Sequence, residues 1–147
     1  MIKKLLTFLE IEKPELESQE ELTVPLATAV LFYEVMRADH VINPKEIEAF
    51  RTTVMKEMDV ESGQVKEMLQ KVEQKISESV DYMQFTRLIH ENCSFEEKRK
   101  IIGLLWHLAA ADGHIDPHEE HLIRKFSDLL YLSHSDFIQA KLGAIPH

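Results

Sequence analysis

The chain has 147 residues, a length that predicts one domain, and 44% of them are hydrophobic, which is enough for a buried core. Only four glycines and five prolines are present. This excludes an all-β fold, which needs a turn about every eight to twelve residues. The formal net charge of −9 disfavours nucleic acid and anionic membranes as partners, because both repel an acidic surface. Cations, basic proteins or solubility alone then remain as reasons for the charge.

The only cysteine and the lack of long apolar segments indicate where the protein works. Cys93 has no second cysteine to pair with, so a reducing, cytoplasmic setting is favoured. A nucleophilic thiol is the alternative, but only His90 lies close in sequence, and we favour an incidental role. No stretch approaches the roughly 18 consecutive apolar residues that cross a bilayer. Residues 2–11 predict a short amphipathic helix, and peripheral membrane contact through it is the disfavoured alternative.

From residue 23 onward, apolar residues recur every three or four positions, which is the periodicity of helices. The fold class is therefore all-α, a single-domain bundle of about seven or eight helices. After the helix at 2–11, the predicted helices span 23–38, 44–58, 61–78, 81–92, 95–111 and 117–132, with a last turn or two after Ser133. The segments 23–38 and 95–111 are the most continuously apolar, and we expect them at the centre of the domain.

A polar connector holding Pro14 follows the first helix. We therefore expect an N-terminal helix and connector at 1–21, a helical domain at 22–142 and a frayed tail at 143–147.

Three helix starts carry a capping signature, in which a cap residue stands three positions before a glutamate. These are Asn43-Pro44-Lys45-Glu46, Asp116-Pro117-His118-Glu119 and Ser94-Phe95-Glu96-Glu97. In the first two, proline stands at the first helical position, where its missing N–H costs nothing. These three boundaries are the best determined in the sequence.

Two segments repeat one pattern at an offset of 73 residues, the distance from Asp39 to Asp112. Ala38-Asp39-His40-Val41-Ile42-Asn43-Pro44-Lys45-Glu46 aligns with Ala111-Asp112-Gly113-His114-Ile115-Asp116-Pro117-His118-Glu119. Each copy reads as an apolar helix, a tight loop and an amphipathic helix, so we expect an internal repeat related by a pseudo-twofold axis. Gly113 stands where a left-handed residue ends a helix.

The repeated Ala-Asp-Gly-x-Ile-Asp-x-x-Glu pattern, after Leu104-Leu105-Trp106-x-Leu108-Ala109, resembles the TerB-like family, named for tellurite-resistance protein B. The resemblance covers about residues 26–140. It implies an all-helical bundle that binds cations or protein partners, without enzymatic activity, in a stress response of the tellurite-resistance type. The first copy departs from the pattern, with His40 in place of glycine and Asn43 in place of aspartate.

The acidic residues of the two loops have a structural and a metal-binding interpretation. Capping explains Glu46, Glu119 and Asp116. Asp39 and Asp112 instead end helices, where the helix dipole disfavours negative charge. Each could accept local hydrogen bonds, or it could hold a divalent cation with the glutamate of the next helix. Calcium or magnesium would suit such oxygen ligands, but an EF-hand is excluded because Pro117 and Ile123 stand where glycine and glutamate are required.

Histidines give a second metal hypothesis, because imidazole with carboxylate suits zinc or nickel. His114, His118 and His121 gather around the second loop, although a solvated surface is the favoured interpretation. No Glu-x-x-His pair, glycine-rich phosphate loop or nucleophile elbow is present. We therefore predict a non-enzymatic module with an unknown protein partner. A metal-dependent enzyme using these loops and histidines is the alternative.

One further pair stands out in the apolar helices. Glu34 and His107 occupy equivalent positions of the repeat. Buried ionisable groups of this kind occur at functional sites. Arg37 follows Glu34 by three residues on a helix, however, so a structural ion pair is the favoured interpretation.

Overall fold

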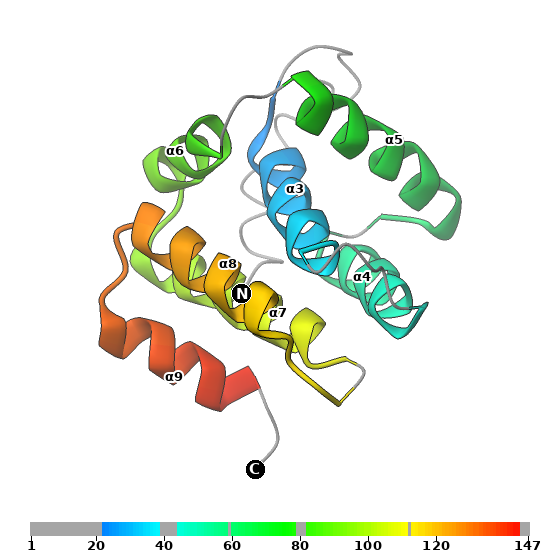
Figure 1. Cartoon of the computed structure of the whole chain (residues 1–147). Coiled ribbons are helices and arrows are strands. Elements are labelled where there is room, and N and C mark those ends of the chain that lie inside the picture. The colour runs from blue at the N-terminus through cyan, green and yellow to red at the C-terminus, as the bar shows by residue number, and fades with distance from the viewer. Residues whose placement is uncertain (1–21, 39–43, 59, 79–81, 112, 145–147) are drawn as a thin grey trace.

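A computed structural model of the protein describes residues 22–38, 44–58, 60–78, 82–111 and 113–144. These residues form helices and no strands, which confirms the predicted all-α class. The helices are α3 (Val24–Met36), α4 (Pro44–Glu57), α5 (Ser62–Glu78), α6 (Met83–Asn92), α7 (Phe95–Ala109), α8 (Pro117–Leu129) and α9 (His134–Ala144) (Figure 1). The helix predicted at 2–11, its connector and the last three residues of the chain lie outside the described residues.

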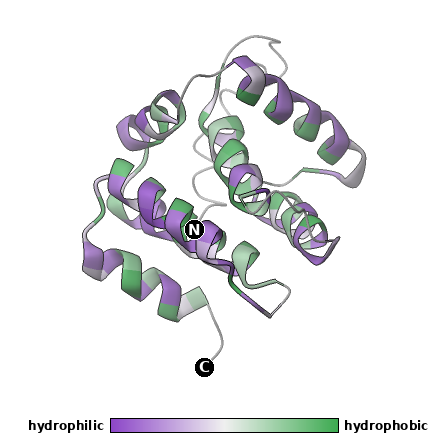
Figure 2. Ribbon diagram, viewed as in Figure 1, coloured by the Kyte–Doolittle hydropathy of each residue, from purple (hydrophilic) through white to green (hydrophobic). Residues whose placement is uncertain are grey.

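Helix α3 forms the centre of the molecule, as its continuous apolar sequence predicts. All of its residues except Tyr33 are buried. It contacts α4, α5, α6, α7 and α8, which surround it in Figure 1. Figure 2 shows hydrophobic residues along α3, whereas hydrophilic residues occupy much of α5 and α8. The helix is capped by Thr23, whose side chain accepts a hydrogen bond from the Leu26 amide at 3.4 Å.

Helix α7 is the second central element, and it packs on α3, α4, α8 and α9. The Trp106 side chain of α7 is fully buried, with its ring centre 5.2 Å from that of Phe137 on α9. Helix α9 is longer than the turn or two expected from the sequence, and Gly143 and Ala144 complete it. Only Phe137 in α9 is fully buried, so the apolar periodicity of this helix is weak. Packing on α7 therefore stabilises α9 where its own sequence does not.

The predicted capping boxes at Ser94 and Asp116 are both present. Ser94 accepts from the Glu97 amide at 3.1 Å, and Glu97 accepts from the Ser94 amide at 2.7 Å. The predicted left-handed residue after α7 is also confirmed, because Gly113 has a φ of 85°. The third predicted cap, Asn43, lies outside the described residues.

Each copy of the sequence repeat forms a helix pair whose members are in contact, α3 with α4 and α7 with α8. The two pairs meet through α3 and α7, their apolar helices. Both copies therefore contribute to one hydrophobic core. The pseudo-twofold relation between them stays a prediction.

Candidate functional site

The described acidic residues of the loops lie at the starts of α4 and α8. Glu46 and Glu119 occupy equivalent positions of the repeat, and each is buried, with 3% of its surface exposed. Glu119 Oε1 accepts a hydrogen bond from the Asp116 amide at 3.1 Å. Glu119 therefore acts as a capping residue, as one of the two interpretations predicted. Asp39 and Asp112 lie outside the described residues.

Asp116 is also used locally. Its Oδ1 accepts from the His118 backbone amide at 2.8 Å and lies 2.9 Å from Nδ1 of the same histidine. The backbone hydrogen bond is the main reason why the pKa of Asp116 is lower than usual. The described residues contain no group of three or more His, Cys, Asp or Glu side chains placed to hold a metal ion. The predicted metal site also requires Asp39 or Asp112, so it stays a prediction.

Two of the predicted histidines, His118 and His121, line an open pocket, and His114 does not. The pocket has a volume of about 700 Å³ and lies between α3, Tyr82 at the start of α6, and α8. We call it the α3–α6–α8 pocket, and it is lined by Tyr33, Glu34, Arg37, Ala38, Tyr82, Pro117, His118, His121 and Leu122. His107, the repeat equivalent of Glu34, is exposed on α7 and is not among these residues. The volume falls within the range of sites for small ligands or short peptide segments.

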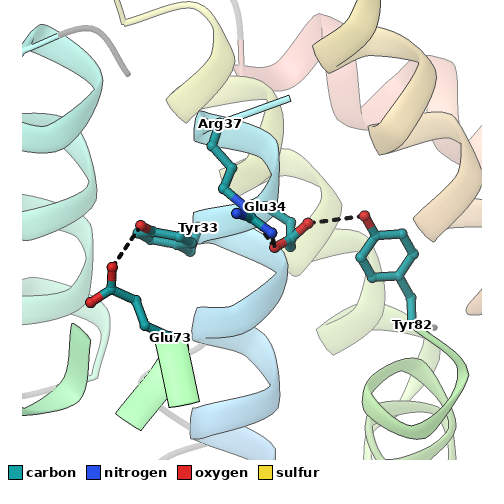
Figure 3. Close-up of polar contacts among 5 residues, drawn as sticks. All are labelled: Tyr33, Glu34, Arg37, Glu73 and Tyr82. Carbon is teal, nitrogen blue, oxygen red and sulfur yellow. Dashed lines mark hydrogen bonds and ion pairs between the residues drawn. The ribbon is translucent and has the colours of Figure 1, made fainter. Parts of the chain in front are cut away.

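The residues that line the pocket include a buried carboxylate, Glu34, which is held by two other side chains (Figure 3). Glu34 Oε1 accepts from Arg37 Nε at 2.9 Å and lies 2.7 Å from Arg37 Nη2. Glu34 Oε2 accepts from the hydroxyl of Tyr82 at 2.9 Å. Only 7% of the Glu34 side chain is exposed, against 45% for Arg37. The carboxylate is thus neutralised inside the protein, while the guanidinium extends from it to solvent.

Tyr82 links the pocket to two helices. Burial, followed by the hydrogen bond to Glu34, raises the pKa of Tyr82 to about 12. The Tyr82 ring meets Phe126 of α8 edge-on, with ring centres 5.0 Å apart. Lys125 Nζ lies 5.2 Å from the centre of the Tyr82 ring. Tyr82 therefore holds the Glu34 carboxylate by a hydrogen bond and also contacts a second cation beside the pocket, Lys125.

Tyr33 also lines the pocket, and its hydroxyl points away from Tyr82, as Figure 3 shows, and donates to Glu73 Oε2 of α5 at 3.1 Å. Burial raises its pKa too, with the Glu73 hydrogen bond the next cause. A second, largely apolar pocket of about 340 Å³ lies beyond it and is lined by residues of α3, α4 and α5.

Sequence reasoning identified part of this site and missed its other members. The Glu34–Arg37 pair was predicted from helical spacing and is confirmed. Tyr82 was not predicted as a partner of Glu34, because 48 positions of sequence separate the two residues. The one signal available in the sequence was the isolated carboxylate of Glu34 in an apolar helix, since such a group requires partners.

The helical fold and the paired loops agree with a comparison with known families. A family model described as "Tellurite resistance protein TerB" matches residues 25–142. The chain belongs to the TerB family. This confirms the resemblance inferred from the repeated loops. Comparisons of this TerB protein with curated proteins and with solved structures gave no match. None of its described helices is long and apolar enough to cross a membrane.

Proposed function

We propose that this TerB protein is a non-enzymatic binding module of the cytoplasm that engages a protein partner through the α3–α6–α8 pocket. The observation that carries the proposal is the pocket itself, built around a buried carboxylate locked by Arg37 and Tyr82. A stress role of the tellurite-resistance type is suggested by the family description alone.

The chemistry of the pocket favours binding over catalysis. A general base must be free to accept a proton from a substrate. Both oxygens of Glu34 already accept hydrogen bonds, and Tyr82 keeps its proton because its pKa is raised to about 12. Preformed groups of this kind lose little freedom when a partner docks, which favours affinity.

A matched pair of substitutions tests the pocket as the partner-binding site. His121→Glu changes an exposed histidine at the pocket, and His107→Glu makes the same change on α7, away from it. Partners captured from native cells by the wild-type chain should be lost with His121→Glu and retained with His107→Glu. Equal capture by the two variants would contradict the proposal. A partner lost with both would place the binding surface elsewhere.

Cation binding at the second loop is a second candidate function. It is supported by two acidic residues at the start of α8, Asp116 and Glu119. The Asp116 backbone amide donates a hydrogen bond to the Glu119 carboxylate, which keeps the two residues close together. Asp112 would supply the further ligand, with Asp39 and Glu46 as the corresponding residues of the first loop. Calcium or magnesium is the proposed ion. Zinc or nickel would instead recruit His114, His118 or His121.

Titration calorimetry with calcium, magnesium, zinc and nickel tests this second candidate. A cation site predicts heat of binding below millimolar metal that is lost in Asp112→Asn, while stability in metal-free buffer changes little. If no metal binds, or if Asp112→Asn mainly lowers the melting temperature without metal, the acidic residues are structural. Metal-dependent hydrolytic or redox activity would instead support the alternative of an enzyme.

A further inference from the structure

We infer that the α3–α6–α8 pocket accepts an acidic segment of a protein partner, a carboxylate side chain followed by an apolar one. The inference rests on the proposed function and adds the chemistry of the ligand. It follows from the charge of the groups around the pocket and from the apolar surface between them.

Of the Glu34–Arg37 ion pair that lines the pocket, the cation is far more exposed than the carboxylate. Arg37 has five N–H donors, and its contacts with Glu34 involve Nε and Nη2 only. The remaining donors belong to a side chain that is 45% exposed at the pocket. A planar guanidinium with free donors suits a carboxylate, which it can bind through two parallel hydrogen bonds.

Helix α8 supplies another side of the pocket, with the ammonium group of Lys125 beside it. His118 and His121 stand three residues apart, and Lys125 follows His121 by four, so the three share one face of the helix. The His118 side chain is 75% exposed, and Asp116 occupies its Nδ1. This leaves Nε2 as the ring nitrogen available to a ligand.

Glu34 does not oppose an acidic ligand, because its charge is compensated inside the protein. Its Oε1 is held by Arg37 and its Oε2 by Tyr82. The net charge of −9 acts from farther away. At physiological ionic strength, charges more than about 8 Å apart in solvent are largely screened. The nearby donors therefore decide which ligand charge the pocket prefers.

The apolar part of the segment has its own place. Pro117 and Leu122 of α8 line the pocket together with the rings of Tyr33 and Tyr82. An aromatic or aliphatic side chain next to the carboxylate would bury its surface there, which contributes to affinity in proportion to the area covered. A carboxylate beside an apolar side chain thus matches both halves of the pocket.

Three capped peptides of equal length test the inference on the full chain: acetyl-Glu-Phe-Glu-amide, acetyl-Gln-Phe-Gln-amide and acetyl-Lys-Phe-Lys-amide. Binding is followed by the NMR shifts of the backbone amides, which every variant retains. We expect the Glu peptide to bind at least tenfold more tightly than the other two. The double variant His118→Ala/His121→Ala should lose at least tenfold of this affinity. The matched control is His107→Ala/His134→Ala, which removes two exposed histidines outside the pocket and should bind like the wild type.

Equal binding of the Glu and Gln peptides, or tighter binding of the Lys peptide, would overturn the inference. So would benzoate alone binding as tightly as the Glu peptide, since the ligand would then be a free organic anion. If none of the three peptides binds, the inference fails. The proposed function then still stands, provided that His121→Glu abolishes the capture of partners from native cells. If that capture survives, the proposed function fails as well.

Discussion

At the scale of single residues, Glu34 explains how a charge is kept inside an apolar helix. A buried carboxylate without a partner destabilises the folded state. Removing one partner of a buried ion pair lowers the free energy of unfolding by about 3–5 kcal/mol. Arg37 supplies two contacts to one oxygen and Tyr82 one to the other. Arg37 lies at the end of the same helix and Tyr82 directly precedes α6, so the charge also ties the start of α6 to the centre.

Replacing Tyr82 by phenylalanine should lower the free energy of unfolding by about 1–3 kcal/mol, because a buried acceptor of Glu34 loses its donor. The pKa of Tyr82 is about 12 in the folded protein and about 10 in an unfolded chain. The hydroxyl therefore contributes fully below pH 10, and its contribution is lost as the pH rises towards 12. Denaturant unfolding of wild type and Tyr82→Phe should converge over that range.

The control for this prediction is Tyr131→Phe. Tyr131 is 69% exposed, so the loss of its hydroxyl should change stability little at any pH. A difference between wild type and Tyr82→Phe that stays constant up to pH 12 would contradict the assigned role of the hydroxyl.

Cys93 gives a second prediction at this scale. Burial raises the pKa of its thiol to about 12, and the thiolate is the reactive form. The folded protein should therefore react only slowly with a disulfide reagent at mildly alkaline pH, and the urea-unfolded chain rapidly. Spectrophotometric thiol titration measures both rates. Fast reaction of the folded protein would instead support the alternative that Cys93 is a reactive nucleophile.

At the scale of helices, stability depends on how each end is closed and on how closely neighbours approach. Helix α7 begins at the Ser94–Glu97 capping box. Helix α8 ends at Leu129, and Tyr131, two residues beyond it, has a φ of 62°. There the Leu132 amide donates to the Ser127 carbonyl at 3.1 Å and the Tyr131 amide to that of Asp128 at 3.0 Å. This closed end directs the chain into α9, which packs on α7.

Ser94→Ala removes the side-chain acceptor of the α7 cap and should lower the free energy of unfolding by about 1 kcal/mol. Ser135→Ala is the control, because Ser135 is exposed within α9, where alanine is at least as favourable as serine. Thermal and denaturant unfolding measure both variants. Equal effects would show that the α7 cap contributes nothing particular to stability.

Gly103 tests the approach of α7 to α9. A Cβ added there would lie 3.9 Å from the Ala140 carbonyl oxygen, an ordinary contact distance. Gly103→Ala should therefore stabilise the protein by about 0.5–1 kcal/mol through helix propensity. Gly103→Val adds two further methyl groups near α9 and should lower the free energy of unfolding of the protein. Both are measured by chemical unfolding, and a destabilising alanine would mean that the contact is tighter than described.

At the scale of the whole molecule, the two repeat units share one core. Helices α3 and α7 pack on each other, and each also packs on the partner helix of its own unit. Neither unit could unfold without exposing apolar surface of the other. Small domains of this kind unfold in a single transition.

We therefore expect the fluorescence of Trp106, the only tryptophan, and far-UV circular dichroism to report the same denaturant midpoint. Trp106 is fully buried between α7 and α9, and the dichroism averages over all helices. A fluorescence change at lower denaturant would show that α9 separates from the bundle before the core unfolds.

Much of this architecture was determined by the sequence alone, because it depends on local chemistry. Three kinds of feature depend only on residues that are close in sequence: helical periodicity, the capping boxes at Ser94 and Asp116, and the left-handed conformation of Gly113. Their expected structures were all found. The repeated loops also identified the family, since a pattern present twice in the same order is specific.

The tertiary structure alone decided where the pocket lies and how far α9 extends. Tyr82 meets Glu34 across 48 positions of sequence, and His118 and His121 reach the same pocket from α8. Helix α9 is weakly patterned and forms against Trp106 and the rest of α7. Such features depend on which helices become neighbours, and that follows from burying the apolar surfaces of all the helices together.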